Sequence, residues 1–229
     1  MLKIVAETDN YWVIDKPAGL LSQKDSGGED SLIQEIQKIT GAKFVGLVHR
    51  LDRNTSGLML LAKDPRSAEI FTDALQRDQL IRRYEAILSG HIENDFSWTH
   101  FLEKNPSKNH VTVFRRPSPL SKEARLHGRC LKNFSIKGNP VSLVEFQLET
   151  GRSHQIRSQA AFEKHPIIGD HRYGKKLPPA LMDFPRPALH SSFLSFKDPK
   201  SKAPISFDSQ LKLNDFTTES IHVLRGQTS

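Results

Sequence analysis

Hydrophobic and polar positions alternate over much of the chain, and this period of two indicates β-strands. In the first half, residues 3–7 and 11–15 alternate around the turn residues Asp9 and Asn10, and residues 58–62 form a continuous apolar run. In the second half, four further segments alternate or run apolar: 82–90, 110–114, 123–132 and 140–150. The pattern therefore predicts many strands, mostly neighbours in hairpins.

Helical spacing is confined to a few segments. Residues 31–40 carry apolar side chains at helical intervals, and Gly41 follows as a stop signal. A second helix is expected from Asp64 and Pro65, a capping residue followed by a favoured first-turn residue, to about Gln76. Few helices beside many strands predict an α+β fold, a mixed and largely antiparallel β-sheet with flanking helices and loops.

The last third of the chain changes character. Residues 151–164 predict a third helix, with Ser153 as its cap. The proline-containing stretches 178–190 and 197–204 predict a loop-rich tail that ends in a short helix at most, and Thr217 to Ser229 are expected to fray. We find no repeat and no long linker, so one domain spanning residues 1–229 is expected.

The charge balance narrows the class of partner. The chain carries a formal net charge of +7 and has a pI of about 9.5, which favours a polyanion such as nucleic acid, although a merely basic surface explains the charge equally well. Cys130 is the sole cysteine, which excludes an internal disulfide and indicates a reducing compartment. Since no signal core and no apolar run of about 18 residues occurs, a cytoplasmic protein without a membrane anchor is expected.

The sequence HRLDRNTSGLMLLAKD, residues 49–64, places one acid among several cations. Asp52 is flanked by His49, Arg50 and Arg53 at the entrance to the apolar run. Nearby cations stabilise an ionised carboxylate, and an ionised acid weakens a patch that attracts phosphate. Because the acid weakens the attraction for phosphate, its presence suggests that Asp52 acts as a nucleophile or a base. The alternative interpretation is a solvated turn with dispersed charges.

Two other groups of cations are candidates for binding. Arg152, His154 and Arg157 stand at a predicted strand-to-helix junction, where free backbone N–H groups gather; ordinary polar residues at a helix start are the alternative. A stripe formed by Arg125, His127 and Arg129 shares one face of a predicted strand, which suits a phosphate backbone or a merely solvated face. The histidines show no metal-binding spacing.

Several stretches, in order along the chain, resemble motifs of the RluA family of pseudouridine synthases. The two most specific are HRLDRNTSGLMLLAKD and LETGRSHQIR (148–157), the latter followed by HPIIGDHRYG (165–174). VIDKPAGL (13–20) is similar to the N-terminal motif, RRYEAILSG (82–90) to the tyrosine motif, and RPALHSSFLSF (186–196) to the C-terminal one.

The resemblance implies an enzyme that isomerises uridine in ribosomal or transfer RNA, without cofactor or metal, on the pseudouridine synthase fold. The essential aspartate falls on Asp52, the active-site tyrosine on Tyr84 and the arginine that pairs with the acid on Arg157. Leu189 of the C-terminal motif is implied to lie near the site. The residues expected to bind substrate RNA are, with Leu189, His49, Arg50, Arg53, Arg125, Arg129, Arg152 and His154.

Departures from the family pattern concern the substrate. Ser158, Gln159 and Ala160 follow HQIR where relatives often have other residues, and Lys164 stands where glycine is common. The chain is expected to be a monomeric catalytic domain without the small N-terminal RNA-binding domain of the S4 type. Two other classes stay open: a catalytically silent RNA-binding protein on the same fold, and a nucleoside hydrolase, which would require a second partnered carboxylate.

Overall fold

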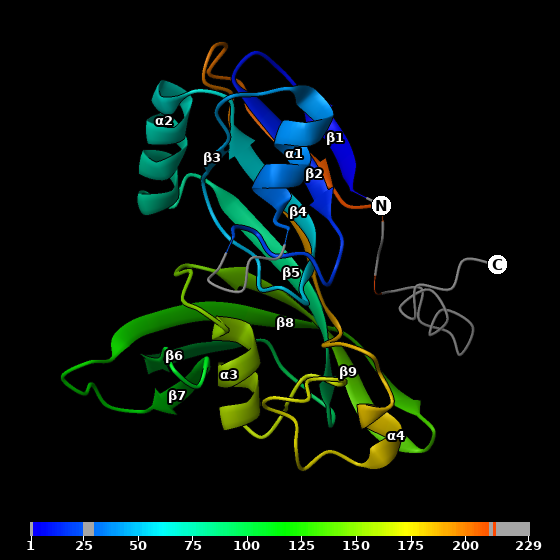
Figure 1. Ribbon diagram of the computed structural model, residues 1–229. Helices are drawn as coiled ribbons and strands as arrows, with labels where there is room; N and C mark the ends of the chain where they lie inside the picture. The colour runs from blue at the N-terminus through cyan, green and yellow to red at the C-terminus, as the bar shows by residue number, and fades with distance from the viewer. Residues whose placement is uncertain (1, 25–29, 211–212, 214–229) are drawn as a thin grey trace. The chain divides into compact units, whose positions relative to one another are not determined.

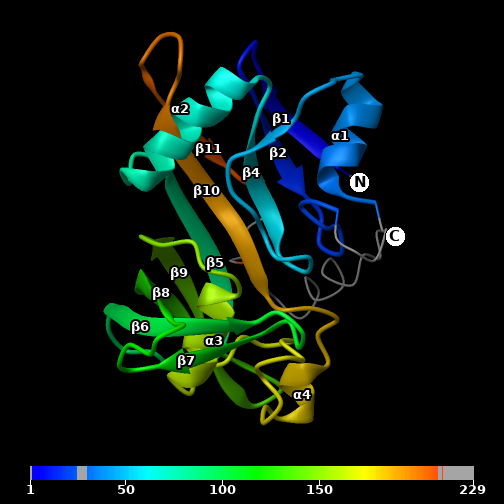
Figure 2. The same ribbon diagram turned by 60° about the vertical axis from the view of Figure 1, so that its left-hand side comes forward.

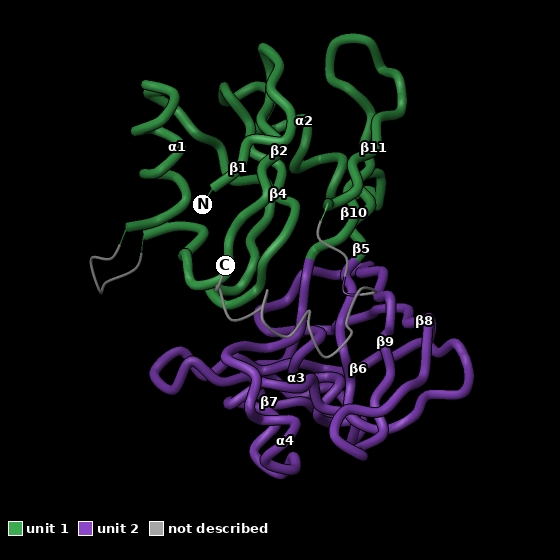
Figure 3. Tube along the Cα trace, turned by 90° about the vertical axis from the view of Figure 1, so that its right-hand side faces the viewer, with its two compact units in different colours: residues 1–83, 191–211 green, residues 84–190, 212–229 purple. Residues whose placement is uncertain are grey.

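The computed structural model describes residues 2–24, 30–210 and 213. The chain divides into two compact units, residues 1–83 with 191–211 (unit 1) and residues 84–190 with 212–229 (unit 2), which Figure 3 colours separately. The division falls within two strands, since β5 (Ile81–Ser89) and β10 (Leu189–Lys197) each have residues in both units. The single domain expected from the sequence stays a prediction.

Unit 1 is built on a sheet in which β1 (Lys3–Glu7), β2 (Tyr11–Lys16), β4 (Ser56–Ala62) and β10 are neighbours in that order. The short β3 (Gly46–Leu47) pairs with β4, and β11 (Pro204–Asp208) pairs with β10. Figure 2 shows β2, β4 and β10 running side by side. The pairs β1–β2, β2–β4, β3–β4 and β10–β11 are antiparallel.

Two helices accompany this sheet, and both have the predicted ends. Helix α1 (Leu32–Thr40) stops at Gly41, whose left-handed backbone directs its N–H to the Gln37 carbonyl oxygen. Helix α2 (Pro65–Gln76) starts at Asp64, whose side chain accepts the Ser67 N–H at 2.9 Å. The apolar stripe of α1 is shorter than its sequence suggests, because Ile39 is 57% exposed.

Aromatic packing joins the sheet of unit 1 to helix α2. Tyr11 of β2, Phe71 of α2 and Phe196 of β10 meet edge to face, with ring centroids 5.1–5.8 Å apart. All three are at most 2% exposed. Such burial stabilises a core by roughly 1.5–3 kcal/mol for each large apolar side chain. This cluster supports the back of β4, the strand that directly follows the Asp52 turn.

Unit 2 contains β5, β9 (Asn139–Leu148), β8 (Lys122–Ile136), β6 (Phe96–Asn105) and β7 (His110–Phe114) as successive neighbours (Figure 1). The pairs β8–β9, β6–β8 and β6–β7 are antiparallel. Helix α3 (Gln155–Phe162) packs on β6 and β7, and α4 (Pro179–Met182) is a single turn. The α+β class with a largely antiparallel sheet is confirmed.

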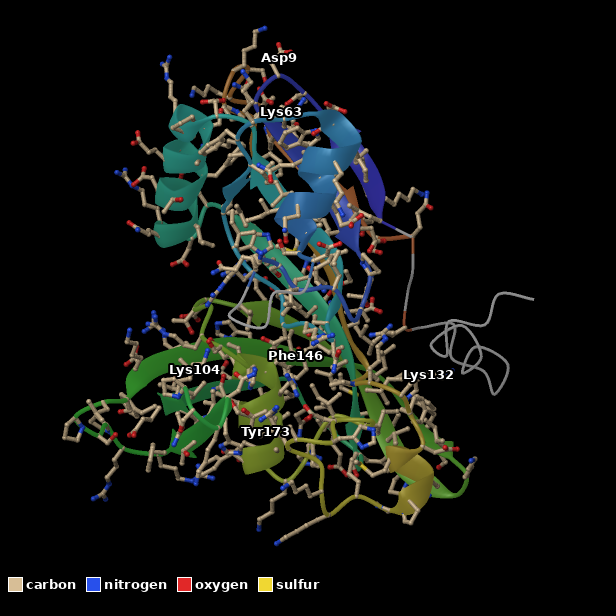
Figure 4. The ribbon with its side chains drawn as sticks, viewed as in Figure 1. Asp9, Lys63, Lys104, Lys132, Phe146 and Tyr173 are labelled. Carbon is tan, nitrogen blue, oxygen red and sulfur yellow. The ribbon has the colours of Figure 1, made fainter. Side chains whose placement is uncertain are left out.

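A second aromatic cluster fixes the long strands of unit 2. Phe96 stacks on Trp98 with a centroid distance of 4.3 Å, and both contact Phe146, which Figure 4 labels. The ring of Phe96 also covers Gly128 of β8, where an added Cβ would lie 2.1 Å from the ring. A larger residue at this point of the strand would therefore displace the Phe96 ring.

Two expectations from the sequence were wrong. Helix α3 begins after His154, which has a left-handed backbone (φ 52°), and not at Ser153 as predicted. The tail expected to be loop-rich contains α4, β10 and β11. The predicted fraying from Thr217 to Ser229 lies outside the described residues. Within the described part, no helix is both long and apolar enough to cross a membrane.

Candidate active site

Asp52 lies in unit 1, partly buried, in the turn that leads into β4. Thr55 donates its backbone N–H to the Asp52 carbonyl oxygen at 3.0 Å and closes this turn. The turn ends at Gly57, whose φ is +113° and whose added Cβ would lie 2.3 Å from the Ser191 carbonyl oxygen. The glycine of the motif is thus required by its backbone angle and by the close approach of β10.

Both neighbours of Asp52 are tied to the loop that follows β2. The Ser22 hydroxyl donates to the Leu51 carbonyl oxygen at 2.7 Å and accepts the Leu51 N–H at 3.2 Å. On the other side, the Gly19 N–H donates to the Arg53 carbonyl oxygen at 2.9 Å, and Arg53 Nε donates to the Gly19 carbonyl oxygen at 3.0 Å. These contacts hold the backbone in one place on both sides of Asp52.

Lys16 reinforces the same junction from inside the protein. Its side chain is fully buried, and Nζ donates to the carbonyl oxygens of Pro17, Leu20 and Arg53 at 2.9, 2.8 and 3.1 Å. A buried ammonium is retained where several acceptors surround it. Lys16 is not among the site residues predicted from the sequence, although a lysine that ends an apolar strand directly before Pro17 is a recognisable signal.

The cations around Asp52 differ sharply in exposure. Arg50 and Arg53 are exposed, whereas His49 is only 6% exposed and accepts the Leu60 N–H on Nε2 at 3.2 Å. Burial, together with the charge of Arg82, lowers the pKa of His49 to about 3, so its imidazole is neutral. RNA contact by His49 and by the two exposed arginines stays a prediction.

Tyr84 and Leu189 are buried residues of unit 2. Tyr84 lies in β5 and is 4% exposed, and Leu189 begins β10 with the same exposure. Arg83, directly before Tyr84 in the chain, stacks on the Phe193 ring in unit 1 at 3.8 Å. A role of Tyr84 and Leu189 at the active site stays a prediction.

Arg157 of α3 has a buried partner that the sequence did not predict. Its Nε donates to Asp170 Oδ2 at 2.7 Å and its Nη2 to Asp170 Oδ1 at 3.0 Å. The Asp170 side chain is completely buried and also accepts the backbone N–H groups of Arg172 and Tyr173. Asp170, interpreted from sequence as a structural turn residue, therefore orients the guanidinium of Arg157. The pairing of Arg157 with Asp52 stays a prediction.

His154 belongs to the same part of unit 2. Its Nδ1 lies 2.8 Å from the Tyr173 hydroxyl, which accepts the Val111 N–H at 2.9 Å. The Tyr173 ring, labelled in Figure 4, faces the Arg157 guanidinium at 5.3 Å. His154 and Arg157, predicted together from the GRSHQIR motif, are thus linked through one tyrosine that sequence analysis did not identify.

The cationic stripe of β8 faces solvent, as predicted, but carboxylates accompany it. Arg125 pairs with Glu149 at 2.6 Å and with Glu123, and Arg129 pairs with Glu145 at 2.9 Å. Hydrogen bonding to Glu149 raises the pKa of Arg125, and the same contact lowers the pKa of Glu149. The exposed face of β8 and β9 therefore carries alternating charges instead of a continuous positive strip.

A shallow groove of about 440 Å³ lies on this mixed face. Its lining comes from β8, β9 and the start of β6: Asp95, Phe96, Ser97, His127, Gly128, Arg129, Glu145 and Gln147.

Arg152 is exposed, and its Nε donates to the Glu123 carbonyl oxygen at 2.9 Å. Within unit 2, Arg125, Arg129 and Arg152 thus occupy one polar region, and their contact with RNA stays a prediction.

The chain matches the family model described as RNA pseudouridylate synthase over residues 10–162. Among curated proteins it is 33% identical over 216 residues to the ribosomal large subunit pseudouridine synthase D of Salmonella typhimurium, covering 87% of this chain and 64% of that protein. The enzyme of the same name from Vibrio cholerae is 32% identical over 223 residues, covering 90% of this chain and 66% of that protein. The chain therefore spans slightly less than two thirds of these relatives' length.

Solved structures show the same fold. Human RNA Pseudouridylate Synthase Domain Containing 4 aligns with a TM-score of 0.73 at 24% identity, covering 97% of this chain and 93% of that chain. Human RNA Pseudouridylate Synthase Domain Containing 1 aligns with a TM-score of 0.73 at 21% identity, covering 99% and 96%. At 21% and 24% sequence identity, this similarity is evidence for the fold alone.

Proposed function

The chain belongs to the RNA pseudouridylate synthase family, and on this premise we propose that it isomerises uridine to pseudouridine in RNA. The observation that carries the proposal is that the matched segment, two thirds of the chain, contains Asp52, Tyr84 and Arg157 together. The first substrate class is ribosomal RNA of the large subunit, which the names of the relatives specify for those proteins. Transfer RNA is the second.

The proposed reaction rearranges one nucleoside without a net exchange of atoms. The N1–C1′ bond breaks, the uracil turns, and C5 bonds to C1′; C5 then loses its proton, and N1, which carries none in uridine, gains one. Because a stacked uridine cannot be reached, we propose that it is flipped into the pocket. The protein works without cofactor or metal, as a monomer, in the cytoplasm.

We assign the roles as follows. Asp52 supplies the essential carboxylate, either as a nucleophile toward the sugar or the base, or as a base. The contacts of Lys16, Ser22 and Gly19 support this assignment, because they immobilise the backbone on both sides of Asp52. Tyr84 stacks on the uracil or accepts the C5 proton.

Arg157 is proposed to pair with the Asp52 carboxylate and hold its orientation. The bidentate contact with Asp170 supports this role, since it fixes the plane of the guanidinium before substrate arrives. A guanidinium that a second carboxylate already holds can present its other edge without losing further side-chain freedom.

The test is direct measurement of product. The purified chain is incubated separately with unmodified large-subunit ribosomal RNA and unmodified transfer RNA, and pseudouridine is quantified in each. We expect product in the ribosomal RNA. Product in transfer RNA alone would refute the substrate assignment, and no product in either RNA would leave the silent RNA-binding protein as the better interpretation. Mapping pseudouridines in cells that lack the gene then identifies the uridine.

A further inference from the structure

Arg82, at the start of β5 in unit 1, is a buried arginine with an unusual environment. It is 5% exposed, and its Nε is fully buried without an acceptor. Among the residues that the structure describes, no hydrogen bond or ion pair involves its guanidinium. The other strongly buried arginine, Arg157, is held by a carboxylate at 2.7 and 3.0 Å. A charge buried without a partner destabilises a protein, so its retention points to a ligand.

His49 supplies a second unpaired donor close to the first. Its Nε2 accepts the Leu60 N–H, so the proton of the neutral ring is assigned to Nδ1. Nδ1 is also fully buried and has no partner within the described part of the chain. Arg82 lies near enough that its charge, with burial, lowers the pKa of His49. The two side chains therefore offer N–H donors and no acceptor. The strand that His49 contacts, β4, and the strand of Arg82, β5, flank β10, where the Ser191 hydroxyl donates to the Leu58 carbonyl oxygen of β4 and the Ser192 hydroxyl donates to the Arg83 carbonyl oxygen of β5.

The chemistry of this pair defines the ligand it fits. A guanidinium and a neutral imidazole N–H carry together one positive charge, and both groups only donate. The matching ligand is an oxyanion with several acceptor oxygens, and the planar fork of arginine fits phosphate in particular. The two Nη nitrogens of Arg82 are not among the fully buried atoms without a partner, so the guanidinium retains an edge that solvent reaches.

We propose that Arg82 and His49 form a subsite for one phosphate group of the RNA strand. The inference rests on the proposed function, which supplies the polyanion. His49 stands three positions before Asp52 and Arg82 two positions before Tyr84, so the subsite is carried by the same two segments as the proposed reacting groups. A phosphate bound there would fix the RNA backbone while making no sequence-specific contact.

The test compares three full-length proteins: wild type, Arg82→Met and, as a matched control, Arg66→Gln, which removes an exposed arginine of α2. Inorganic phosphate is titrated at constant ionic strength while the melting temperature is followed. We expect phosphate to stabilise wild type and the control, and to lose this effect in Arg82→Met. Without phosphate, Arg82→Met should be at least as stable as wild type, because the methionine removes an unpaired buried charge.

The second readout is the salt dependence of affinity for a single-stranded uridine-containing RNA. One lost phosphate contact should reduce the slope of log affinity against log salt by about 0.7, so that wild type loses about 2.6-fold more affinity than Arg82→Met between 50 and 200 mM salt. Arg66→Gln should keep the wild-type slope. His49→Phe, which removes the imidazole donor but leaves the charge, should weaken the phosphate effect with little change in slope.

Two results would overturn the inference. If Arg82→Met keeps both the phosphate effect and the slope, water alone satisfies these donors. If Arg82→Met is strongly destabilised or unfolded without phosphate, the guanidinium has a structural role in the free protein. Both readouts measure binding, so they are separable from turnover: a protein that makes no pseudouridine but shows these binding changes would refute the proposed function and leave the subsite standing.

Discussion

The buried pair of Arg157 and Asp170 allows a quantitative prediction for Asp170→Ala. The substitution removes the carboxylate that accepts two hydrogen bonds from the buried guanidinium of Arg157, and breaking a buried ion pair costs about 3–5 kcal/mol. It also removes the acceptor of two partly buried backbone N–H groups, those of Arg172 and Tyr173, at about 1–3 kcal/mol each where water does not replace the carboxylate. Because domains are stable by about 5–15 kcal/mol in total, we expect a loss of at least about 3 kcal/mol.

The assay exploits the two tryptophans of the chain. Trp12 lies in unit 1 and Trp98 in unit 2 with Asp170, so a Trp12→Phe background leaves fluorescence that reports unit 2 alone. Urea denaturation in this background should show a midpoint lowered by about 1 M or more, taking a dependence of about 3 kcal/mol per M. Replacing both partners, in Arg157→Met with Asp170→Leu, should recover the part of this loss that comes from the guanidinium but not the part that comes from the backbone N–H groups of Arg172 and Tyr173.

A matched control comes from the surface. Asp73 and Arg77 form an exposed pair on α2 at 3.0 Å, one turn apart. Asp73→Ala should cost less than about 1 kcal/mol, as exposed pairs usually do. If Asp170→Ala costs no more than this control, the reasoning that Asp170 holds a buried guanidinium is refuted.

Three further predictions follow from the buried polar groups. Lys16→Met should lower the free energy of unfolding of unit 1 by at least about 3 kcal/mol, because three carbonyl oxygens lose a charged donor; an unchanged urea midpoint would contradict this. His49 and His190 have pKa values of about 3 when folded, against 6.5 when unfolded, so their stabilisation is complete above pH 6.5 and is lost as the pH falls toward 3. The free energy of unfolding, followed by urea denaturation, should therefore fall by up to about 2.7 kcal/mol per pH unit below pH 6, and a flat profile between pH 6.5 and 5 would reject neutral burial. Tyr84→Phe should reduce turnover about 10²-fold or more with RNA affinity unchanged, and a rate within a few-fold of wild type would exclude proton transfer by its hydroxyl.

Most of the fold could be predicted from local pattern, and the errors have physical causes. Strands with apolar side chains at alternate positions, such as β2, β5 and β9, could be predicted from the sequence. β6 and β10 were not predicted, because buried polar residues occupy inward positions: His100 in β6, and Ser191 in β10, whose hydroxyl donates to the Leu58 carbonyl oxygen. Hydrogen bonds to other parts of the fold allow such polar residues to be buried, and the local sequence does not reveal these hydrogen bonds.

The predicted start of helix α3 was wrong for a related reason. Ser153 has the composition of a cap, but the Gln155 side chain accepts from the Arg152 N–H at 2.9 Å and from the Thr150 hydroxyl at 2.9 Å. This long-side-chain contact organises the junction and leaves His154 in the left-handed region. The side chain of Gln155 thus fixes the junction through groups that precede the helix, and the composition of the first turn does not show this contact.

The motifs of the candidate site could be identified from the sequence, but the contacts that hold their side chains could not. The patterns around Asp52 and Arg157 were found, but their supports come from distant parts of the chain: Lys16 for Arg53, and Asp170 for Arg157. The β8 stripe shows the same limit, since Arg129 has Glu145 of β9 beside it. Cross-strand neighbours are set by register, which spacing within one strand does not reveal.

The Asp52→Asn variant decides whether Asp52 performs the chemistry of an RNA isomerase. Asparagine matches the shape of aspartate but is neither a carboxylate nucleophile nor a base, and it removes a negative charge that repels phosphate. Wild type and variant are incubated with unmodified ribosomal RNA, and bound RNA and pseudouridine are both measured. The account predicts that the variant folds, binds RNA at least as tightly as wild type and forms no pseudouridine. Pseudouridine made by the variant at the wild-type rate would contradict it.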